Sequence, residues 1–318
     1  MKKALLMLLA VALVGAGMAP VDVQAATRKK AVATKKKAPR VARQIKAKKP
    51  LRARAAPRRA SLDDAQSLAL QSSAALVLDQ TTGTILFQKN PGAVLPIASI
   101  TKLMTAMVVL DAKPDLNETL AVTDEDVDVL KGTRSRLKVG THLAREEMLR
   151  LALMSSENRA ASALSRHYPG GRAAFIAAMN QKAQLLGLAD TRFQDPTGLT
   201  AANVSSPRDL AKLVNTAHQY PLIREFSTTS EGEFSIAGRP QQFHNTNTLV
   251  KNPGWEIGLS KTGYISEAGK CLVMQAWFNN KPTIIVLLDS VGKLTRVGDA
   301  NRIKRWIEHA SLVRPTTG

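Results

Sequence analysis

Cysteine and histidine are scarce in this chain of 318 residues, and each shortage excludes a class of site. The single cysteine, Cys271, rules out a disulfide within the chain, and its apolar neighbours predict that it fills space in the core. The five histidines are scattered and show no metal-ligand spacing, so we expect no zinc or other metal centre. We expect no cofactor either, and any chemistry then falls to ordinary side chains.

Apolar runs long enough to cross a membrane are missing after the first 26 residues. The chain starts with two lysines, continues with an apolar run from Ala4 to Met18, and then has small residues at Val23-Gln24-Ala25. This order predicts a signal peptide over 1–25, and the run is too short to favour the alternative of a membrane anchor. Export without disulfides fits a bacterial envelope, so we expect a periplasmic protein.

Acidic and aromatic residues are absent from 27–60, which holds 15 lysines and arginines. The net charge of +20 is therefore concentrated here, since the first 26 residues contribute +1 and the remainder of the chain only +4. Repelling charges and few side chains to bury predict a disordered basic arm over 26–66. The arm either binds an anionic wall or membrane polymer or is a solvated spacer. Nucleic acid is disfavoured as a partner because the chain is exported.

The composition becomes globular near Ser67 and predicts one domain over 67–312, followed by a tail over 313–318. Two β-hairpins are expected, one over 74–90 and one over 270–289. Strands at both ends with helices between them indicate an α/β (α+β) domain. We expect the terminal strands to join in one antiparallel sheet flanked by helices.

Apolar periodicity and capping residues predict the helices of this domain. Ser206, followed by Pro207, is a favourable N-cap for one of them. The helices are expected to start at Ser99, to occupy 142–164 with a break at Ser155-Ser156, to follow Ser206, and to run from Leu294 to Ala310.

Ser99 and Lys102 lie three residues apart at the start of an apolar run, so a helix places both on one face. A serine becomes a good nucleophile when a base takes its proton, and a lysine can be that base when burial lowers its pKa. The pattern alone is weak, because it recurs at Ser135–Lys138 and Ser290–Lys293. A serine N-cap with a lysine that reaches solvent explains an isolated case better.

Two further motifs favour the catalytic interpretation. Ser156-Glu157-Asn158 falls at the predicted helix break, and Lys261-Thr262-Gly263 precedes a strand-forming run. Each pattern occurs once in the chain. Their order and spacing match the Ser-x-x-Lys, Ser-x-Asn and Lys-Thr-Gly trio of penicillin-binding proteins and class A β-lactamases.

On these residues the chain resembles the serine D-Ala-D-Ala peptidases among the low-molecular-mass penicillin-binding proteins, and within them the D-alanyl-D-alanine endopeptidase type. The resemblance runs from about Ala74 to Trp306 and includes Asp195-Pro196-Thr197-Gly198-Leu199, which is typical of these peptidases and not of β-lactamases. It implies a penicillin-binding-protein/β-lactamase-like transpeptidase fold with a helical subdomain. It also implies hydrolysis of D-alanyl cross-links in peptidoglycan muropeptides through an acyl-serine, with β-lactams as inhibitors.

The resemblance implies that Ser99, Lys102 and Ser156 are catalytic and that Asn158 and Lys261 belong to the substrate-binding residues beside them. Ser99 attacks the carbonyl between two D-alanine-type units, and Lys102 takes its proton. Ser156 passes a proton to the leaving amine, supported electrostatically by Lys261. Asn158 is expected to hydrogen-bond Lys102 or the substrate.

The resemblance also implies where the substrate binds. Lys261, Thr262 and Gly263 should line an edge strand to which the substrate backbone is added, with Gly263 leaving room for its close approach. The backbone N–H groups of Ser99 and Tyr264 should form the oxyanion hole. Arg134 and Arg136 either face the acidic muropeptide or lie in a solvated loop, and the solvated loop is favoured. His244 either reaches the rim of the site or makes structural hydrogen bonds, and the structural role is favoured.

Three alternatives stay open. A carboxypeptidase that removes a terminal D-alanine would use the same residues, although the 55 residues after Gly263 fit the shorter endopeptidase type better. A β-lactamase would need a deacylating carboxylate in a Glu-x-x-Leu-Asn pattern between the second and third motifs, and none occurs there. A non-catalytic wall-binding protein would not require the motif trio to be intact.

Overall fold

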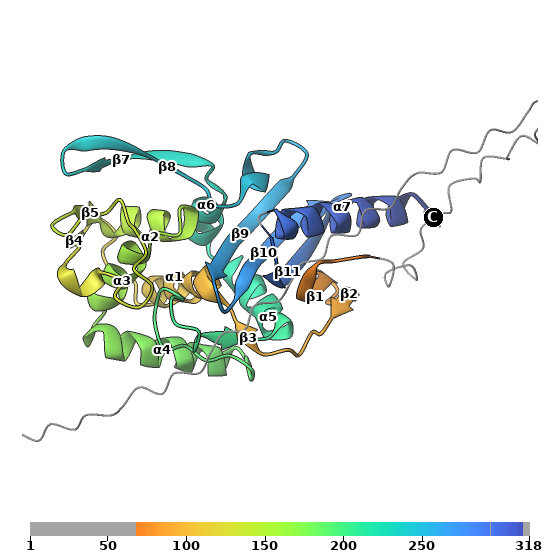
Figure 1. Cartoon of the computed structure of the whole chain (residues 1–318), viewed down its shortest axis with the longest axis horizontal. Coiled ribbons are helices and arrows are strands. Elements are labelled where there is room, and N and C mark those ends of the chain that lie inside the picture. The colour runs from red at the N-terminus through yellow and green to blue at the C-terminus, as the bar shows by residue number, and fades with distance from the viewer. Residues whose placement is uncertain (1–67, 293, 314–318) are drawn as a thin grey trace, which may run out of the picture. The chain divides into compact units, whose positions relative to one another are not determined.

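The computed structural model describes residues 68–292 and 294–313, with only the backbone for 310–313 (Figure 1). The predicted signal peptide and basic arm lie outside these residues, as does nearly all of the predicted tail. Those three segments and the boundaries of the domain therefore stay predictions.

A five-stranded antiparallel sheet forms the centre of the described part, with strand order β2-β1-β11-β10-β9 (Figure 1). The first two strands come from the N-terminal end of the domain and the other three from its C-terminal end, as the sequence pattern predicted. Both predicted hairpins, β1–β2 and β10–β11, are present. The strands are β1 (Ser72–Asp79), β2 (Ile85–Lys89), β9 (Glu256–Ile265), β10 (Gly269–Phe278) and β11 (Lys281–Ser290).

Helices cover both faces of the sheet. Helix α7 (Thr295–Val313) packs on one face, where Ile303, Trp306 and Ile307 are buried as their predicted common face requires. Helices α5 (Pro207–Ala217) and α6 (Pro221–Thr228) pack on the other face. At the start of α5 the Ser206 hydroxyl accepts from the backbone N–H of Asp209, which confirms the predicted N-cap.

A group of helices lies beyond the β9 edge of the sheet (Figure 1). Its central member is α1 (Lys102–Asp111), whose first eight residues are all buried, because neighbouring helices surround it. The other members are α2 (Arg145–Met154), α3 (Asn158–Arg166) and α4 (Gly171–Leu185). The mixed α/β class and the helical subdomain are both observed.

Some element boundaries differ from those expected. The segment at Ser99 is a 3-10 turn, η2 (Ala98–Thr101), and the α-helix proper starts at Lys102. Residues His142–Ala144 form strand β5, which pairs with β4 (Thr119–Ala121), so the predicted helix begins at Arg145. Pairing with a partner strand overrides the helical pattern there, and periodicity within one segment cannot reveal such a partner.

Several short elements carried no clear sequence signal. The hairpin of β7 (Glu231–Ile236) and β8 (Arg239–His244) is mainly polar and buries only a few apolar side chains. The 3-10 turns η3 (Asp124–Asp126) and η4 (Thr248–Lys251), and the two-residue strands β3 (Leu95–Pro96) and β6 (Val204–Ser205), are too short for periodicity to show.

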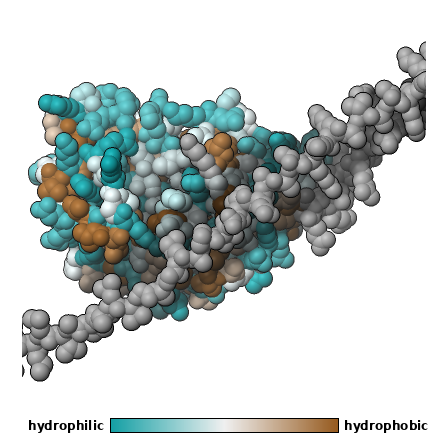
Figure 2. All heavy atoms as spheres, in the orientation of Figure 1, coloured by the Kyte–Doolittle hydropathy of each residue, from teal (hydrophilic) through white to brown (hydrophobic). Residues whose placement is uncertain are grey.

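The surface seen in Figure 2 is mostly hydrophilic, with hydrophobic residues gathered in separate patches. Among the described helices, none combines the length and the apolar composition needed to cross a membrane.

Candidate active site

The three sequence motifs meet at one cavity of about 270 Å³ between η2, the turn from α2 to α3, and the edge strand β9. Ser99 comes from η2, Ser156 comes from the turn, and Asn158 is the first residue of α3. Thr262 and Gly263 come from β9. Lys102 and Lys261 lie behind this lining and are almost fully buried. The described residues that line it are Ser99, Thr133, Ser156, Asn158, Leu199, Thr246, Thr262, Gly263, Tyr264 and Arg296.

Two residues of the lining region have left-handed backbone conformations that non-glycine residues rarely adopt. Ala98, immediately before Ser99, has φ +47, and Ser156 has φ +61. Such conformations cost roughly 1–3 kcal/mol each and persist where the surrounding structure imposes them. Here they direct the hydroxyls of Ser99 and Ser156 into the same cavity.

Lys102 is held by three oxygen atoms. Its Nζ lies 2.8 Å from Ser99 Oγ, 2.7 Å from Asn158 Oδ1 and 2.7 Å from the carbonyl oxygen of Thr197. Burial lowers the pKa of Lys102 from 10.5 to about 7, and the carboxylates of Asp195 and Glu157 oppose that shift. A substantial share of Lys102 is therefore neutral near pH 7 and able to accept a proton.

Lys261 forms a second contact of the same kind. Its Nζ donates to Ser156 Oγ at 2.9 Å and to the carbonyl oxygen of Thr262 at 3.0 Å. Burial lowers the pKa of Lys261 well below 10.5, and the positive charges of Lys102 and Arg296 add to that effect. The site thus holds two serine–lysine pairs that face one cavity.

The Asp195–Leu199 segment supports the first pair from behind. Asp195 accepts from the backbone N–H groups of Thr197, Gly198 and Thr200, which fixes the turn that presents the Thr197 carbonyl to Lys102. Gly198 has φ +83, and a Cβ there would lie 1.9 Å from the carbonyl oxygen of Ala98. Only glycine lets this turn pack against η2.

Strand β9 is an edge strand, as the third motif implied. Gly263 does allow a close approach, but the neighbour is the chain's own backbone. A Cβ on Gly263 would lie 2.8 Å from the carbonyl oxygen of Ile97 and 3.1 Å from the N–H nitrogen of Ser99. Gly263 therefore lets η2 pack against β9 and brings the first motif next to the third.

Of the polar residues that were not assigned to the reaction, Arg136 and His244 have defined partners. Arg136 pairs with the buried Glu157 at 3.4 Å, donates to the carbonyl oxygen of Gln242 in β8, and stacks on Phe243. It links the β7–β8 hairpin to the Ser-x-Asn motif, a stronger role than the solvated loop that was expected. His244 lies 3.2 Å from Glu231, in line with its expected structural role. Arg134 is exposed.

Sequence reasoning missed four contributors to the site. Thr133, Thr246 and Arg296 line the cavity but belong to no recognised motif. Arg296 donates through Nη1 to the carbonyl oxygens of Gly263 and Cys271. The Thr197 carbonyl is a backbone group and leaves no trace in residue identity, although the motif around it was recognised.

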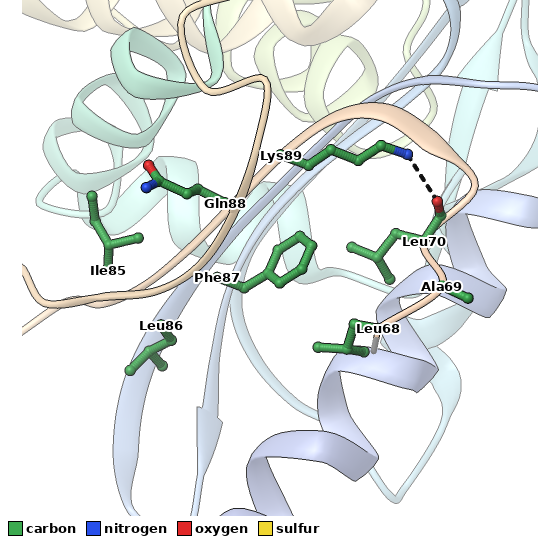
Figure 3. A pocket seen from close by; sticks show the side chains of 8 residues that line it. All are labelled: Leu68, Ala69, Leu70, Ile85, Leu86, Phe87, Gln88 and Lys89. Carbon is green, nitrogen blue, oxygen red and sulfur yellow. Dashed lines mark hydrogen bonds between the residues drawn. The ribbon is translucent and has the colours of Figure 1, made fainter. Parts of the chain in front are cut away.

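A second groove lies at the opposite edge of the sheet, between β2 and residues 68–70 (Figure 3). The described residues that line it are largely apolar, and the one charged residue among them, Lys89, donates to the carbonyl oxygen of Leu70 at 3.0 Å. None of these described residues is a serine, cysteine or histidine. Among the described residues, no group of three or more His, Cys, Asp or Glu is placed to hold a metal ion.

Comparison with known proteins places most of the described part of the chain among bacterial peptidases. The family model described as D-alanyl-D-alanine carboxypeptidase matches residues 61–292. A D-alanyl-D-alanine endopeptidase of Pseudomonas aeruginosa is 50% identical over 79% of this chain and 81% of its own, and one of Escherichia coli is 48% identical over 77% and 79%. A solved Streptomyces DD-transpeptidase is 29% identical with a TM-score of 0.69, covering 75% of this chain and 97% of its own.

Proposed function

The chain belongs to the D-alanyl-D-alanine carboxypeptidase family of serine peptidases, and we propose that it acts in this family as a D,D-endopeptidase that hydrolyses D-alanyl cross-links between peptidoglycan stems. It is a hydrolase with a penicillin-binding-protein fold. The endopeptidase assignment is supported by the names of two relatives that are about half identical to this chain.

The observation that carries the proposal is the contact between Ser99 Oγ and Lys102 Nζ at 2.8 Å, with Lys102 buried and its pKa lowered to about 7. Neutral Lys102 takes the hydroxyl proton of Ser99 as the oxygen attacks the D-alanyl carbonyl. The backbone N–H groups of Ser99 and Tyr264 receive the negative charge that develops on the carbonyl oxygen. The product of this half-reaction is an acyl-serine.

The leaving amine needs a proton as the peptide bond breaks. Ser156 Oγ donates it, and Lys261, which lies 2.9 Å from that oxygen, stabilises the transient negative charge on the hydroxyl. The proton that Lys102 took from Ser99 then passes to Ser156 and restores its hydroxyl, so Lys102 is neutral again in the acyl-enzyme. Lys102 next takes a proton from the water that attacks the acyl-serine and returns it to Ser99 as the ester bond breaks. The site returns to its starting protonation state after each turnover.

The substrate backbone is added as a further strand along the free edge of β9. Arg296 supplies positive charge at the cavity, behind Gly263. The leaving group carries a carboxylate next to its amine both when it is a terminal D-alanine and when it is the D-centre of diaminopimelate. Arg296 therefore serves either substrate, and the catalytic residues do not separate an endopeptidase from a carboxypeptidase.

The carboxypeptidase remains the second candidate function, because the matching family model carries that description. A β-lactam, which presents a strained D-alanyl-like amide, acylates Ser99 in either case. We also propose that the enzyme acts in the periplasm and that residues 27–60 bind an anionic wall or membrane polymer. These two proposals rest on the sequence of segments outside the described residues.

Defined muropeptides test the proposed function. Cross-linked dimers and uncrosslinked pentapeptides are incubated separately with the chain lacking residues 1–25, and the products are weighed by mass spectrometry. We expect dimers to fall to monomers and penicillin to block this reaction. Ser99→Ala should reduce cleavage by at least ~10³-fold, because the acyl-serine cannot form.

Circular dichroism of Ser99→Ala provides the control for folding. Release of only the terminal D-alanine would reassign the enzyme as a carboxypeptidase. Equal cleavage by Ser99→Ala and its parent would refute serine catalysis. No cleavage of either substrate by the folded parent would favour the wall-binding alternative.

A further inference from the structure

The loop that contributes Thr133 to the cavity is organised by one carboxylate. Asp128 accepts from the backbone N–H groups of Leu130, Lys131 and Thr133, and from the Thr133 hydroxyl at 2.7 Å. Partial burial would raise the pKa of Asp128, but these hydrogen bonds outweigh it and the pKa lies below its ordinary value. Asp128 is thus ionised near pH 7 and can only accept hydrogen bonds.

The protonation of Asp128 determines which way the Thr133 hydroxyl points. Because the carboxylate cannot donate, Thr133 must donate its single hydroxyl proton to Asp128 Oδ2. The Thr133 oxygen is then left with lone pairs only, and it accepts from Asn158 Nδ2 at 3.1 Å. The Asn158 amide is therefore oriented with Nδ2 toward Thr133 and Oδ1 toward Lys102.

The orientation of the Asn158 amide matters for the base. Neutral Lys102 has two N–H bonds and one lone pair. Asn158 Oδ1 and the Thr197 carbonyl are acceptors and occupy the two N–H bonds, so the lone pair is left for the Ser99 hydroxyl. A reversed amide would direct Nδ2 at Lys102, where it would donate to the same lone pair and compete with Ser99.

We propose that Asp128 and Thr133 are positioning residues that fix the Asn158 amide and thereby direct the lone pair of Lys102 at Ser99. Neither residue touches the reacting atoms of the substrate in this role. The inference rests on the proposed function of Ser99 and Lys102, and it adds a directional chain of hydrogen bonds, from loop to base, to the three known motifs.

The other charged groups around Lys102 are not members of the hydrogen-bond series that runs from Asp128 through Thr133 and Asn158. Asp195, behind Lys102, and Glu157, next to Asn158, both favour the protonated form of Lys102. Lys261, on β9, interacts with Lys102 unfavourably when both are charged. A substitution at Thr133 changes none of these groups, so a shift in the pH profile reports the orientation of Asn158.

Thr133→Val tests the chain of hydrogen bonds, because valine keeps the shape of threonine and lacks the hydroxyl. The measurement is the second-order rate of acylation by a fluorescent penicillin between pH 5 and 9, on the chain lacking residues 1–25. We expect the plateau rate to fall about tenfold, because the Asn158 amide can reverse and occupy the lone pair. The acid limb should move to lower pH, because a reversed amide no longer stabilises the protonated lysine.

Thr133→Ser is the matched control, because serine restores the hydroxyl, and we expect it to restore the parent's profile. Thr133→Ala provides a second removal of the hydroxyl if valine prevents folding, which circular dichroism detects. An unchanged profile in the folded hydroxyl-free variant would overturn the inference, and so would a serine variant as impaired as valine. A folded parent that is not acylated would overturn the proposed function itself.

Discussion

Lys102 is the residue on which the chemistry depends, and its environment explains how a lysine becomes a base. Burying an ammonium group without a counter-ion costs free energy, and deprotonation of the lysine removes most of that cost. Two fixed acceptors, Asn158 Oδ1 and the Thr197 carbonyl, compensate for part of the lost hydration in either protonation state. Lys102 is the first residue of α1, and the elements packed around that helix bury it.

The acylation rate should follow the protonation of Lys102. The pKa of about 7 means that Lys102 is mainly protonated below pH 7, where it cannot accept the Ser99 proton. We therefore expect acylation by a fluorescent penicillin to rise through pH 7 and to fall about tenfold per pH unit on the acid side. Stopped-flow or gel-based rates between pH 5 and 9 measure this limb.

Lys102→Arg is the control for this pH profile. It keeps a positive charge and a long side chain, but arginine does not lose its proton in proteins. We expect a low rate without the limb near pH 7. A parent rate that stays flat down to pH 5 would contradict the assignment of Lys102 as the base.

Residues of the candidate site that belong to a sequence motif could be named from the sequence, whereas those outside the motifs could not. Ser99, Lys102 and Asn158 lie in contact as the motifs implied. Thr133 could not be found in this way, because its role arises from a loop that reaches Asn158 across 25 positions in sequence. Arg296 likewise belongs to α7, which packs on the face of the sheet opposite α5 and α6. Only the tertiary fold brings its side chain to the cavity.

At the scale of elements, the short turn η2 is the part whose placement decides activity. It is packed against the Asp195–Leu199 segment at Gly198 and against β9 at Gly263, in both cases backbone to backbone. Because neither glycine has a Cβ, both allow η2 to pack closely against the neighbouring backbone. The sequence motifs named both glycines, but only the structure shows that they serve the same element.

Gly198→Ala should displace η2 and destabilise the protein. Its φ of +83 costs an alanine about 1–2 kcal/mol, and the new Cβ would lie 1.9 Å from the Ala98 carbonyl oxygen, adding about 1–3 kcal/mol. Urea denaturation should show the combined loss. Penicillin acylation should fall at least ~10-fold, because a small displacement of Ser99 disturbs its alignment with the base.

Gly187→Ala separates backbone strain from packing. It has φ +65, yet nothing lies within 4 Å of the Cβ that it would gain. We expect a loss of only about 1–2 kcal/mol and a parental acylation rate. If both variants lost the same stability and the same acylation rate, backbone strain alone would explain the effect of Gly198→Ala. The packing of Gly198 against η2 would then be unimportant.

The elements that the sequence predicted well are those whose signal is local. The two long hairpins have strong strand patterns, and Asn279 and Asn280 both have the positive φ that a two-residue turn requires. Strand β5 was mistaken for the start of a helix, because its partner β4 lies far from it in sequence. The β7–β8 hairpin was missed because most of its side chains are polar and exposed.

At the scale of the whole molecule, charge and catalysis are carried by different parts of the sequence. Residues 27–60 hold 15 positive charges and no acidic residue, whereas 61–318 has a net charge of only +4. A nearly neutral catalytic domain has little general attraction for an anionic wall. A basic arm can supply that attraction and raise the local concentration of enzyme at an insoluble substrate.

Removal of residues 27–60 should therefore weaken binding to purified cell walls and leave cleavage of soluble dimers within about twofold of the parent. The parent should sediment with walls in about 0.05 M salt and be released at about 1 M, where charges are screened beyond about 3 Å. An arm of unchanged length with its 15 lysines and arginines replaced by glutamine isolates charge from reach. If the neutral arm sediments as the parent does, the arm is a spacer. If it is lost from walls but still cleaves soluble dimers, electrostatic tethering accounts for the arm and the active site functions without it.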